Sequence, residues 1–195
     1  MSEAFQALIR AVEPHTRLEL EPRDLEIIPS FVQPATYEKG QLLIRPGQQC
    51  NELFFLQKGL MRSFYVFEHK EVNLRLMCEE DAVLAFTSYI QGEPSEEYIE
   101  CVTDCSGWNV RLRALLETHQ SIWLERVMRV LAEQHYLAME RRLRTLQLKN
   151  AEARYLYFCE HLERRIVEDM PSYHIASFLG MTPESLSRIK KNLRS

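Results

Sequence analysis

Residues 171–193 read PSYHIASFLGMTPESLSRIKKNL, and this stretch predicts two short helices joined by a tight turn. Ser172 is placed to cap the first helix, and Gly180 tolerates the left-handed conformation that ends it. Thr182 is placed to cap a second helix beginning at Pro183, where no amide hydrogen is needed. Such a pair is typical of the helix-turn-helix, which lays its second helix in the major groove of DNA.

The expected second helix has an apolar face and a polar face. Leu186, Ile189 and Leu193 recur at helical spacing and predict the inward face. The polar face suits DNA, because arginine pairs with guanine, a carboxylate accepts from cytosine, and lysines neutralise phosphates. A helical hairpin that only packs at the end of a domain is the alternative. The candidate DNA-binding residues are Thr182, Pro183, Glu184, Ser185, Ser187, Arg188, Lys190 and Lys191.

The charge of the chain is unevenly distributed. The net charge over 195 residues is −4, which by itself is unusual for a DNA-binding protein. Residues 138–195, however, carry 11 Lys and Arg against 7 Asp and Glu, whereas residues 1–137 carry 13 against 21. The basic excess therefore lies in the part that contains the predicted helix-turn-helix, as nucleic-acid binding requires.

Before residue 112 the hydrophobic pattern has a period of two. Residues 71–76, EVNLRL, alternate polar and apolar side chains, and residues 53–57 and 60–67 are rich in aromatic and aliphatic ones. Turn residues such as Lys39-Gly40 and Pro46-Gly47 separate the expected strands. We therefore predict an α+β chain in which residues 1–112 form an antiparallel, jelly-roll-like β-roll.

From residue 113 to residue 148 the pattern is helical. Its apolar surface is too wide for a helix that covers only its own β-roll. We therefore expect a long dimerisation helix, and a single helix buried within one monomer is the alternative. Residues 149–169 predict another amphipathic helix, and residues 149–195 are expected to form the DNA-binding domain. The candidate dimer interface consists of Leu124, Val127, Met128, Leu131 and Ala138.

Composition argues against several other classes of protein. Residues 1–21 mix charged and apolar side chains and no apolar stretch approaches a membrane span, so we expect a cytoplasmic protein without a signal peptide. Five scattered cysteines fit reduced thiols. The six histidines are dispersed, whereas metal-dependent enzymes built on jelly rolls need His and Glu clustered on neighbouring strands. We expect no metal site and no enzyme.

These residues resemble the Crp/Fnr family of bacterial transcription regulators over nearly the whole chain. The resemblance implies a cyclic-nucleotide-binding-like β-roll, a dimerising long helix and a DNA-binding helix-turn-helix. The implied function is that of a homodimeric, sequence-specific DNA-binding regulator, with double-stranded DNA and a second copy as partners. RNA polymerase and a small-molecule effector are further candidate partners. The resemblance rests on KGQ at 39–41, RPG at 45–47, LFFLQKGLMR at 53–62, ED at 80–81, IA at 175–176, LG at 179–180 and TPESLSR at 182–188.

The chain departs from the nucleotide-binding members of that family. Those members hold the cyclic phosphate with a backbone turn and an arginine, and the ribose with a glutamate. Here Ala85 matches the glutamate and Ser95-Glu96 matches the arginine-serine pair, while Glu96, Glu97 and Glu100 would repel a phosphate. Cyclic AMP is therefore not expected to bind tightly, and the effector is unknown. The candidate effector pocket consists of Leu84, Ala85, Phe86, Thr87, Ser95 and Glu96.

Two further departures concern cofactors and the C-terminal end. No cysteine cluster opens the chain, so the iron–sulfur version of the family is not supported. A haem version stays open, although no histidine stands out as an axial ligand, and we expect no cofactor. Relatives often continue into a β-hairpin wing, which is not expected in a sequence ending at Ser195. A ligand- or partner-sensing module without specific DNA binding is the alternative function.

Overall fold

The structure is a computed structural model that describes residues 19–193. The first 18 residues of the expected β-roll domain, with residues 194 and 195, lie outside the described residues. The elements up to residue 118 are α2 (Pro22–Ile27), the 3-10 helix η1 (Ile28–Phe31), β1 (Val32–Tyr37), β2 (Leu42–Ile44), β3 (Leu53–Lys58), β4 (Met61–Phe67), β5 (Lys70–Met77), β6 (Ala82–Val83), α3 (Phe86–Gln91), β7 (Tyr98–Cys101), β8 (Cys105–Val110) and α4 (Leu112–Thr118). The remaining elements are α5 (Ile122–Gln147), α6 (Ala151–His161), α7 (Arg164–Asp169), α8 (Ser172–Phe178) and α9 (Pro183–Asn192).

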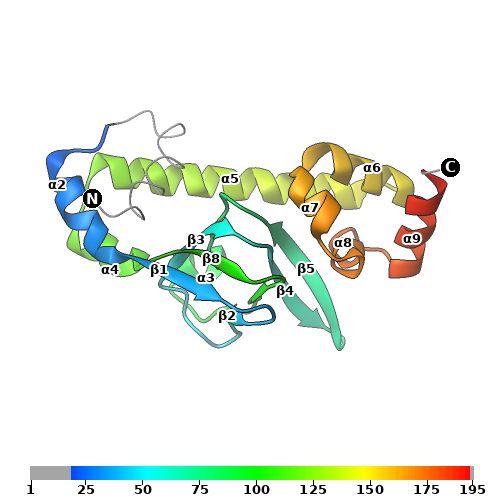
Figure 1. Ribbon diagram of the computed structural model, residues 1–195, viewed down its shortest axis with the longest axis horizontal. Coiled ribbons are helices and arrows are strands. Elements are labelled where there is room, and N and C mark those ends of the chain that lie inside the picture. Colours follow the sequence, from blue (N-terminus) through cyan, green and yellow to red (C-terminus); the bar gives the residue numbers. More distant parts are fainter. Residues whose placement is uncertain (1–18, 194–195) are drawn as a thin grey trace.

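The strands form two four-stranded antiparallel sheets. The first sheet has the order β1-β8-β3-β6 and the second the order β2-β7-β4-β5. Strands β3 and β8 approach so closely that a Cβ on Gly107 would lie 2.0 Å from the carbonyl oxygen of Phe55. The predicted α+β class and the antiparallel β-roll are confirmed, and α5 runs along the top of the roll to the C-terminal helices (Figure 1).

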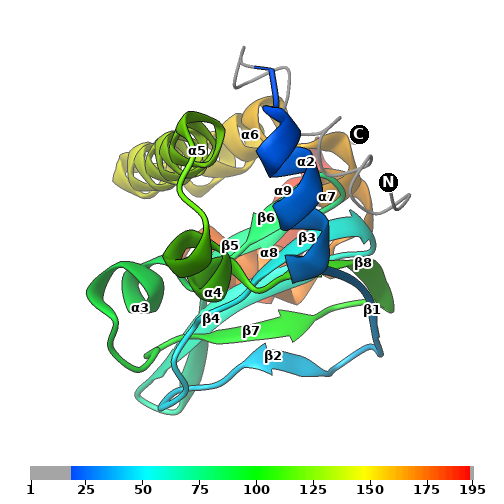
Figure 2. The same ribbon diagram turned by 90° about the vertical axis from the view of Figure 1, so that its left-hand side faces the viewer.

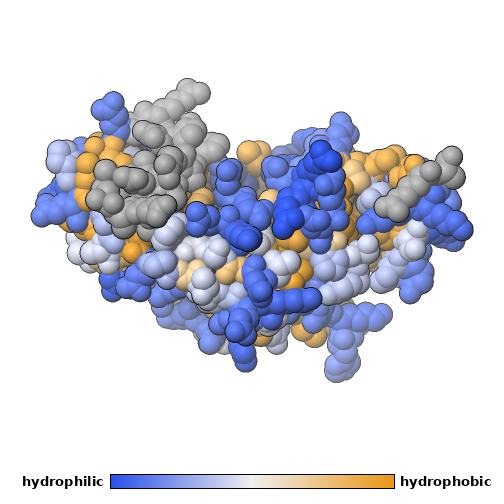
Figure 3. All heavy atoms as spheres, in the orientation of Figure 1, coloured by the Kyte–Doolittle hydropathy of each residue, from blue (hydrophilic) through white to orange (hydrophobic). Residues whose placement is uncertain are grey.

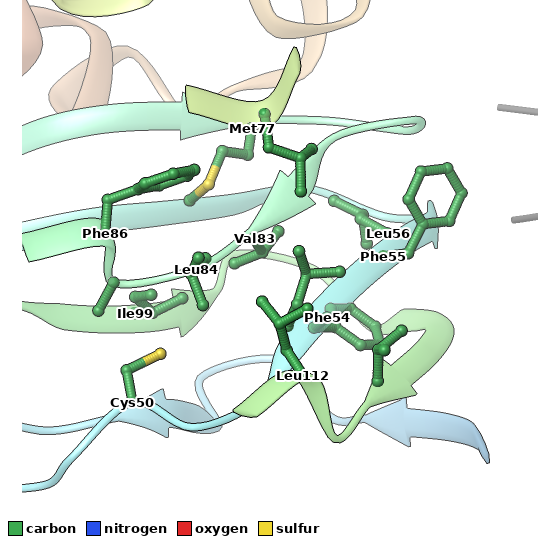
Figure 4. Close-up of a cluster of buried hydrophobic side chains, with 14 of the residues drawn as sticks. Cys50, Phe54, Phe55, Leu56, Met77, Val83, Leu84, Phe86, Ile99 and Leu112 are labelled. Carbon is green, nitrogen blue, oxygen red and sulfur yellow. The ribbon is translucent and has the colours of Figure 1, made fainter. Parts of the chain in front are cut away.

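The core of the β-roll lies between the two sheets. Because side chains alternate along a strand, Phe54 of β3 points between the sheets while Phe55 points to the outer face of the first sheet. Figure 4 shows Leu84 and Ile99 between Phe86 and Cys50 within this core, with Val83 to one side of Leu84. All five cysteines carry free thiols.

The expected long helix is broken near its start, so a single helix from 113 to 148 is wrong. Helix α4 ends at Thr118, and α5 begins only at Ile122, where the side chain of Ser121 accepts a hydrogen bond from the Leu124 amide. His119 lies in the break with extended backbone, and its Nε2 contacts the Asp24 carboxylate at 2.7 Å. Both side chains are buried, so a contact from a distant helix stabilises the break. Figure 2 shows α4 between α5 and the β-roll.

The C-terminal helices are more divided than the pattern predicts. The amphipathic helix expected over 149–169 is two helices, α6 and α7, separated at Leu162 and Glu163. Their apolar side chains form one cluster with α8, α9 and the edge of the β-roll, which contributes Leu60, Leu76 and Val102. The helices from α6 onward are therefore docked on the second sheet rather than joined only through α5. None of the described helices is long and apolar enough to cross a membrane.

Candidate nucleic-acid interface

Helices α8 and α9 form the two predicted short helices. Gly180 lies in the turn with a φ of 62°, the left-handed conformation that favours glycine. Thr182 caps α9 by accepting a hydrogen bond from the Ser185 amide, and Pro183 occupies the first turn. The expected cap at Ser172 is wrong, because Ser172 lies inside α8 and its hydroxyl accepts a hydrogen bond from Lys190 Nζ at 2.9 Å.

Helix α9 buries one face and exposes the other. Leu186 and Ile189 are 0% and 8% exposed, whereas Leu193, predicted to point inward, is 44% exposed because it follows the end of the helix. The candidate DNA-binding residues that lie exposed are Thr182, Pro183, Glu184, Ser187, Arg188 and Lys191. In the space-filling view, hydrophilic residues cover most of this side of the molecule, and apolar ones surface along its upper edge (Figure 3).

Two of the candidate DNA-binding residues are engaged within the protein. Lys190 is half-buried, donates to Ser172 and lies 5.7 Å from the centre of the Tyr155 ring. Ser185 is half-buried and accepts a hydrogen bond from the Thr182 hydroxyl at 3.2 Å. Both side chains therefore stabilise the helix pair in this structure, and the outward cations of α9 are Arg188 and Lys191.

The N-terminal end of α9 favours negative charge. Hydrogen bonding to its own backbone amide and to Thr182 lowers the pKa of Glu184, which is fully exposed. A carboxylate in the first turn is also stabilised by the helix dipole. Glu184 is thus an ionised acceptor one helical turn before Arg188. In DNA-binding proteins a carboxylate can accept from cytosine and an arginine can pair with guanine.

A buried network around Asn73 joins α8 to β5. The Asn73 amide donates to the Ser177 hydroxyl at 3.0 Å, and its side-chain Nδ2 donates to the His174 carbonyl at 3.0 Å. Its carbonyl accepts from Arg142 of α5 at 2.7 Å, and its side-chain oxygen accepts from Arg62 at 3.2 Å. Asn73 is fully buried, so these partners replace water completely.

Charged and titratable groups surround this network. Arg62 is 4% exposed and binds both Glu71, at 2.6 Å, and Glu100, at 2.5 Å. Burial, together with the nearby Arg62 cation, lowers the pKa of His174 to about 4. His174 is therefore neutral at pH 7. The period-two pattern of residues 71–76 predicted Asn73 on a solvent-facing side, and α8 covers that side instead.

The predicted dimer-interface residues face their own β-roll. Leu124 and Leu131 are 3% and 9% exposed and belong to the core cluster of the roll, and Val127 and Met128 pack against it. Ala138 lines the cavity between α5 and the first sheet. The exposed apolar stripe of α5 lies elsewhere, at the heptad-like spacing of Ala132, Tyr136, Leu143 and Leu146, with the half-buried Met139 between them.

The candidate effector residues do not share one cavity. Leu84 lines a cavity of about 380 Å³ between the two sheets, whereas Phe86 lines a cavity of about 430 Å³ under α5. Ala85 and Ser95 are buried, and the Ser95 hydroxyl bonds the backbone of Glu97. Thr87 and Glu96 are exposed. Glu100 is paired with Arg62, so it does not act on an anion in either cavity.

Comparison with known proteins identifies the class. Residues 34–121 match the family described as the cyclic nucleotide-binding domain. FixK2 from Bradyrhizobium japonicum is 18% identical with a TM-score of 0.72, and the match covers 84% of each chain. A crp/fnr family transcriptional regulator from Eubacterium rectale is 17% identical with a TM-score of 0.68, covering 90% of this chain and 84% of the other.

The c-di-GMP-responsive global regulator CLP of Xanthomonas campestris is 17% identical with a TM-score of 0.68, covering 89% of this chain and 92% of that one. No curated protein matches the sequence. Residues 34–121 therefore match the cyclic nucleotide-binding domain family, and the chain has the fold of Crp/Fnr regulators, as the resemblance of its motifs predicts. The matching structures are regulators rather than enzymes.

Among residues 19–193, no group of three His, Cys, Asp or Glu side chains is arranged to hold a metal ion. His161, for example, stacks on Tyr157 with 3.9 Å between ring centres.

Proposed function

We propose that this chain is a homodimeric, sequence-specific DNA-binding transcription regulator of Crp/Fnr type that acts in the cytoplasm. The observation that carries the proposal is α9, a capped helix with a buried apolar face and an exposed face bearing Glu184, Ser187, Arg188 and Lys191. The similarity to transcriptional regulators of the crp/fnr family supports it. RNA polymerase is a further candidate partner.

The second copy would pack on the exposed stripe of α5. Apolar residues that alternate at spacings of four and three are the seam of a coiled coil. Tyr136 is 67% exposed and Leu143 is 57% exposed, so pairing two such helices would remove apolar surface from water. A two-fold pair would present two α9 helices to half-sites about one turn of DNA apart.

The effector domain is proposed to work without tight binding of cyclic AMP. Ser95 and exposed Glu96 occupy the place expected for a phosphate-binding arginine, and Ala85 the place of the ribose-binding glutamate. A sensing module without specific DNA binding is the second candidate, and the match to the cyclic nucleotide-binding domain family favours it.

Fluorescence anisotropy with labelled DNA tests the proposal. We expect Arg188→Ala to weaken binding to a selected site by about 1–3 kcal/mol and to relax base preference at one position. The matched control is Arg164→Ala, because Arg164 is exposed on α7 and, within residues 19–193, forms its ion pair with Glu168 alone. Equal loss in both variants, or unchanged specific binding by Arg188→Ala, would contradict the role of α9.

A further inference from the structure

The cavity of about 430 Å³ lies between α5 and the outer face of the first sheet. Leu53, Phe55 and Val110 line it, whereas Phe54, the intervening residue of β3, lines the separate cavity between the sheets. The cavity under α5 is therefore distinct from the interior of the β-roll. Its volume falls in the range of small-molecule binding sites.

The lining of this cavity becomes more polar along α5. Its first part is lined by Trp123, Leu124, Val127, Val130 and Leu131. Its later part is lined by Gln134, His135 and Arg141 together with the apolar Leu137 and Ala138. With about 1.5 Å of rise per residue, Trp123 and His135 lie roughly 18 Å apart along the helix. Arg75 of β5 joins the polar end, since its positive charge helps to lower the pKa of His135. The cavity is thus long, with apolar walls and one polar end.

Two buried polar atoms of the cavity lining lack hydrogen-bond partners within residues 19–193, and the Arg75 guanidinium has only a long one. Trp123 is 3% exposed, and its indole Nε1 has no partner among the described residues. Nδ1 of His135 is likewise buried without a partner, and the ring stacks on Phe86 at 4.3 Å. The one hydrogen bond found for the Arg75 guanidinium reaches the Ala82 carbonyl at 3.5 Å.

The carboxylates near Arg75 do not form the close ion pair with it that an anionic ligand could form. Within the described residues no carboxylate pairs with Arg75 at ion-pair distance. Burial lowers the pKa of Arg75, and the more distant Asp81 and Glu97 only partly oppose this effect. Asp81 already accepts a hydrogen bond from the Cys78 amide at 2.9 Å. The cavity is also lined by three further acids, Glu79, Glu80 and Glu163. Their negative charge disfavours small hydrophilic anions. The apolar part of a ligand must therefore supply most of the binding free energy.

The proposed dimer leaves this cavity free for a ligand. Val127 lines the cavity and Tyr136 belongs to the exposed stripe, and at about 100° per residue the two lie on opposite faces of α5. A second copy packed on the stripe would not fill the space under the helix. The cavity and the stripe are therefore separate surfaces with different occupants.

We infer that this cavity binds a fatty carboxylate, with the carboxylate at Arg75 and His135 and the alkyl chain running along α5 toward Trp123. The inference deepens the proposed function by naming a ligand class for the effector domain, and ligand binding itself does not depend on DNA binding. A chain of about 18 Å matches the distance between the polar end and Trp123.

Isothermal titration of the full chain with dodecanoate tests the inference, with 1-dodecanol as the uncharged comparison. We expect micromolar dodecanoate binding, quenching or a shift of tryptophan fluorescence, and at least tenfold weaker binding of 1-dodecanol. Arg75→Gln should weaken dodecanoate binding at least tenfold and leave 1-dodecanol unchanged. The matched control Arg23→Gln changes an exposed arginine of α2 and should bind like the wild type.

A second variant, Val127→Phe, fills the apolar part of the cavity and should abolish binding of both probes, with its fold checked by circular dichroism. Absence of dodecanoate binding by the wild type, or equal affinity in Arg75→Gln, would overturn the inference. DNA binding without added dodecanoate is measured in parallel. If the chain binds DNA but not dodecanoate, only the ligand inference fails. If it binds dodecanoate but not DNA, the chain is a ligand-binding module and the proposed DNA-binding function fails.

Discussion

The β-roll meets the rest of the chain through two contacts that differ in kind. At one end α8 packs on β5, where Asn73 is fully buried and its backbone and side chain are bonded to α5, α8 and Arg62. Along its length α5 covers the first sheet over a cavity of about 430 Å³, with unpartnered polar atoms on Trp123 and His135. The first contact is held by hydrogen bonds and borders a smaller cavity of about 150 Å³, and the second lies over the larger cavity.

This difference separates a rigid contact from an adjustable one. A buried polar network of many hydrogen bonds favours a single arrangement, because any other leaves most of its donors and acceptors without partners. An apolar cavity tolerates repacking at lower cost, since no hydrogen bond must break. The α8–β5 contact would therefore fix the orientation of α9, while occupancy of the cavity would shift α5, which carries Arg142 into the Asn73 network.

The largest expected effect on stability comes from changing Asn73, at the centre of the α8–β5 contact. Asn73→Ala deletes the side-chain hydrogen bonds to His174 and Arg62. It leaves in place the Ser177 hydroxyl, which also donates to the backbone carbonyl of Glu71. We expect the free energy of unfolding in urea to fall by about 3 kcal/mol, because buried groups lose their partners. Gln33→Ala, at an exposed position of β1, is the control. A loss below about 1 kcal/mol would show that the contact is not held by this network.

The next effect is a dependence of stability on pH. The folded-state pKa of His174 is lowered to about 4, so between that value and its usual value the unfolded chain binds more protons than the folded one. Stability should therefore be full above the usual histidine pKa and should fall by about 2 kcal/mol from pH 7 to pH 5 through this ring.

Urea denaturation at pH 7 and pH 5 measures this change, and His174→Gln should reduce it. His135, whose pKa burial also lowers to about 4, contributes in the same direction and remains in that variant. If His174→Gln retains the full pH dependence of the wild type, the burial of a neutral His174 in the α8–β5 contact is contradicted.

A smaller effect is expected on dimer formation. Leu143→Ala removes an exposed apolar side chain from the stripe of α5 and should raise the dimer dissociation constant by roughly tenfold, or about 1.4 kcal/mol. Analytical ultracentrifugation measures it, with Val66→Ala as the control, because Val66 is 51% exposed and lies on β4, away from α5. Equal effects of both changes would place the interface elsewhere.

The smallest effect concerns the helix cap. Thr182→Ala removes the acceptor for the Ser185 amide and should lower the free energy of unfolding by about 1 kcal/mol. Thr182→Ser keeps the hydroxyl and should be close to the wild type. Identical melting of the Ala and Ser variants would argue that the cap does not stabilise α9.

Local signals explain which features could be predicted from the sequence. The cap at Thr182, the proline after it and the inward Leu186 and Ile189 all act within α9, and each is confirmed. The alternation of residues 71–76 likewise predicts β5. These features need no knowledge of distant parts of the chain.

The sequence patterns did not predict the features that depend on contacts between distant parts of the chain. The break before α5 depends on His119 meeting Asp24 across 95 positions, and the apolar pattern continues through it. The burial of Asn73 depends on α8, about a hundred positions away. The wide apolar surface of α5 predicts more than one packed side, but only the packing shows that Leu124 and Leu131 face the roll.

The most direct test of the central claim is selection of bound sequences from random duplex DNA by the full chain. The account predicts enrichment of a two-fold symmetric motif whose half-sites lie about one helical turn apart, with loss of one base preference in Arg188→Ala. Retention of DNA without any enriched motif, or the same motif and affinity for Arg188→Ala, would contradict recognition of DNA by the exposed face of α9.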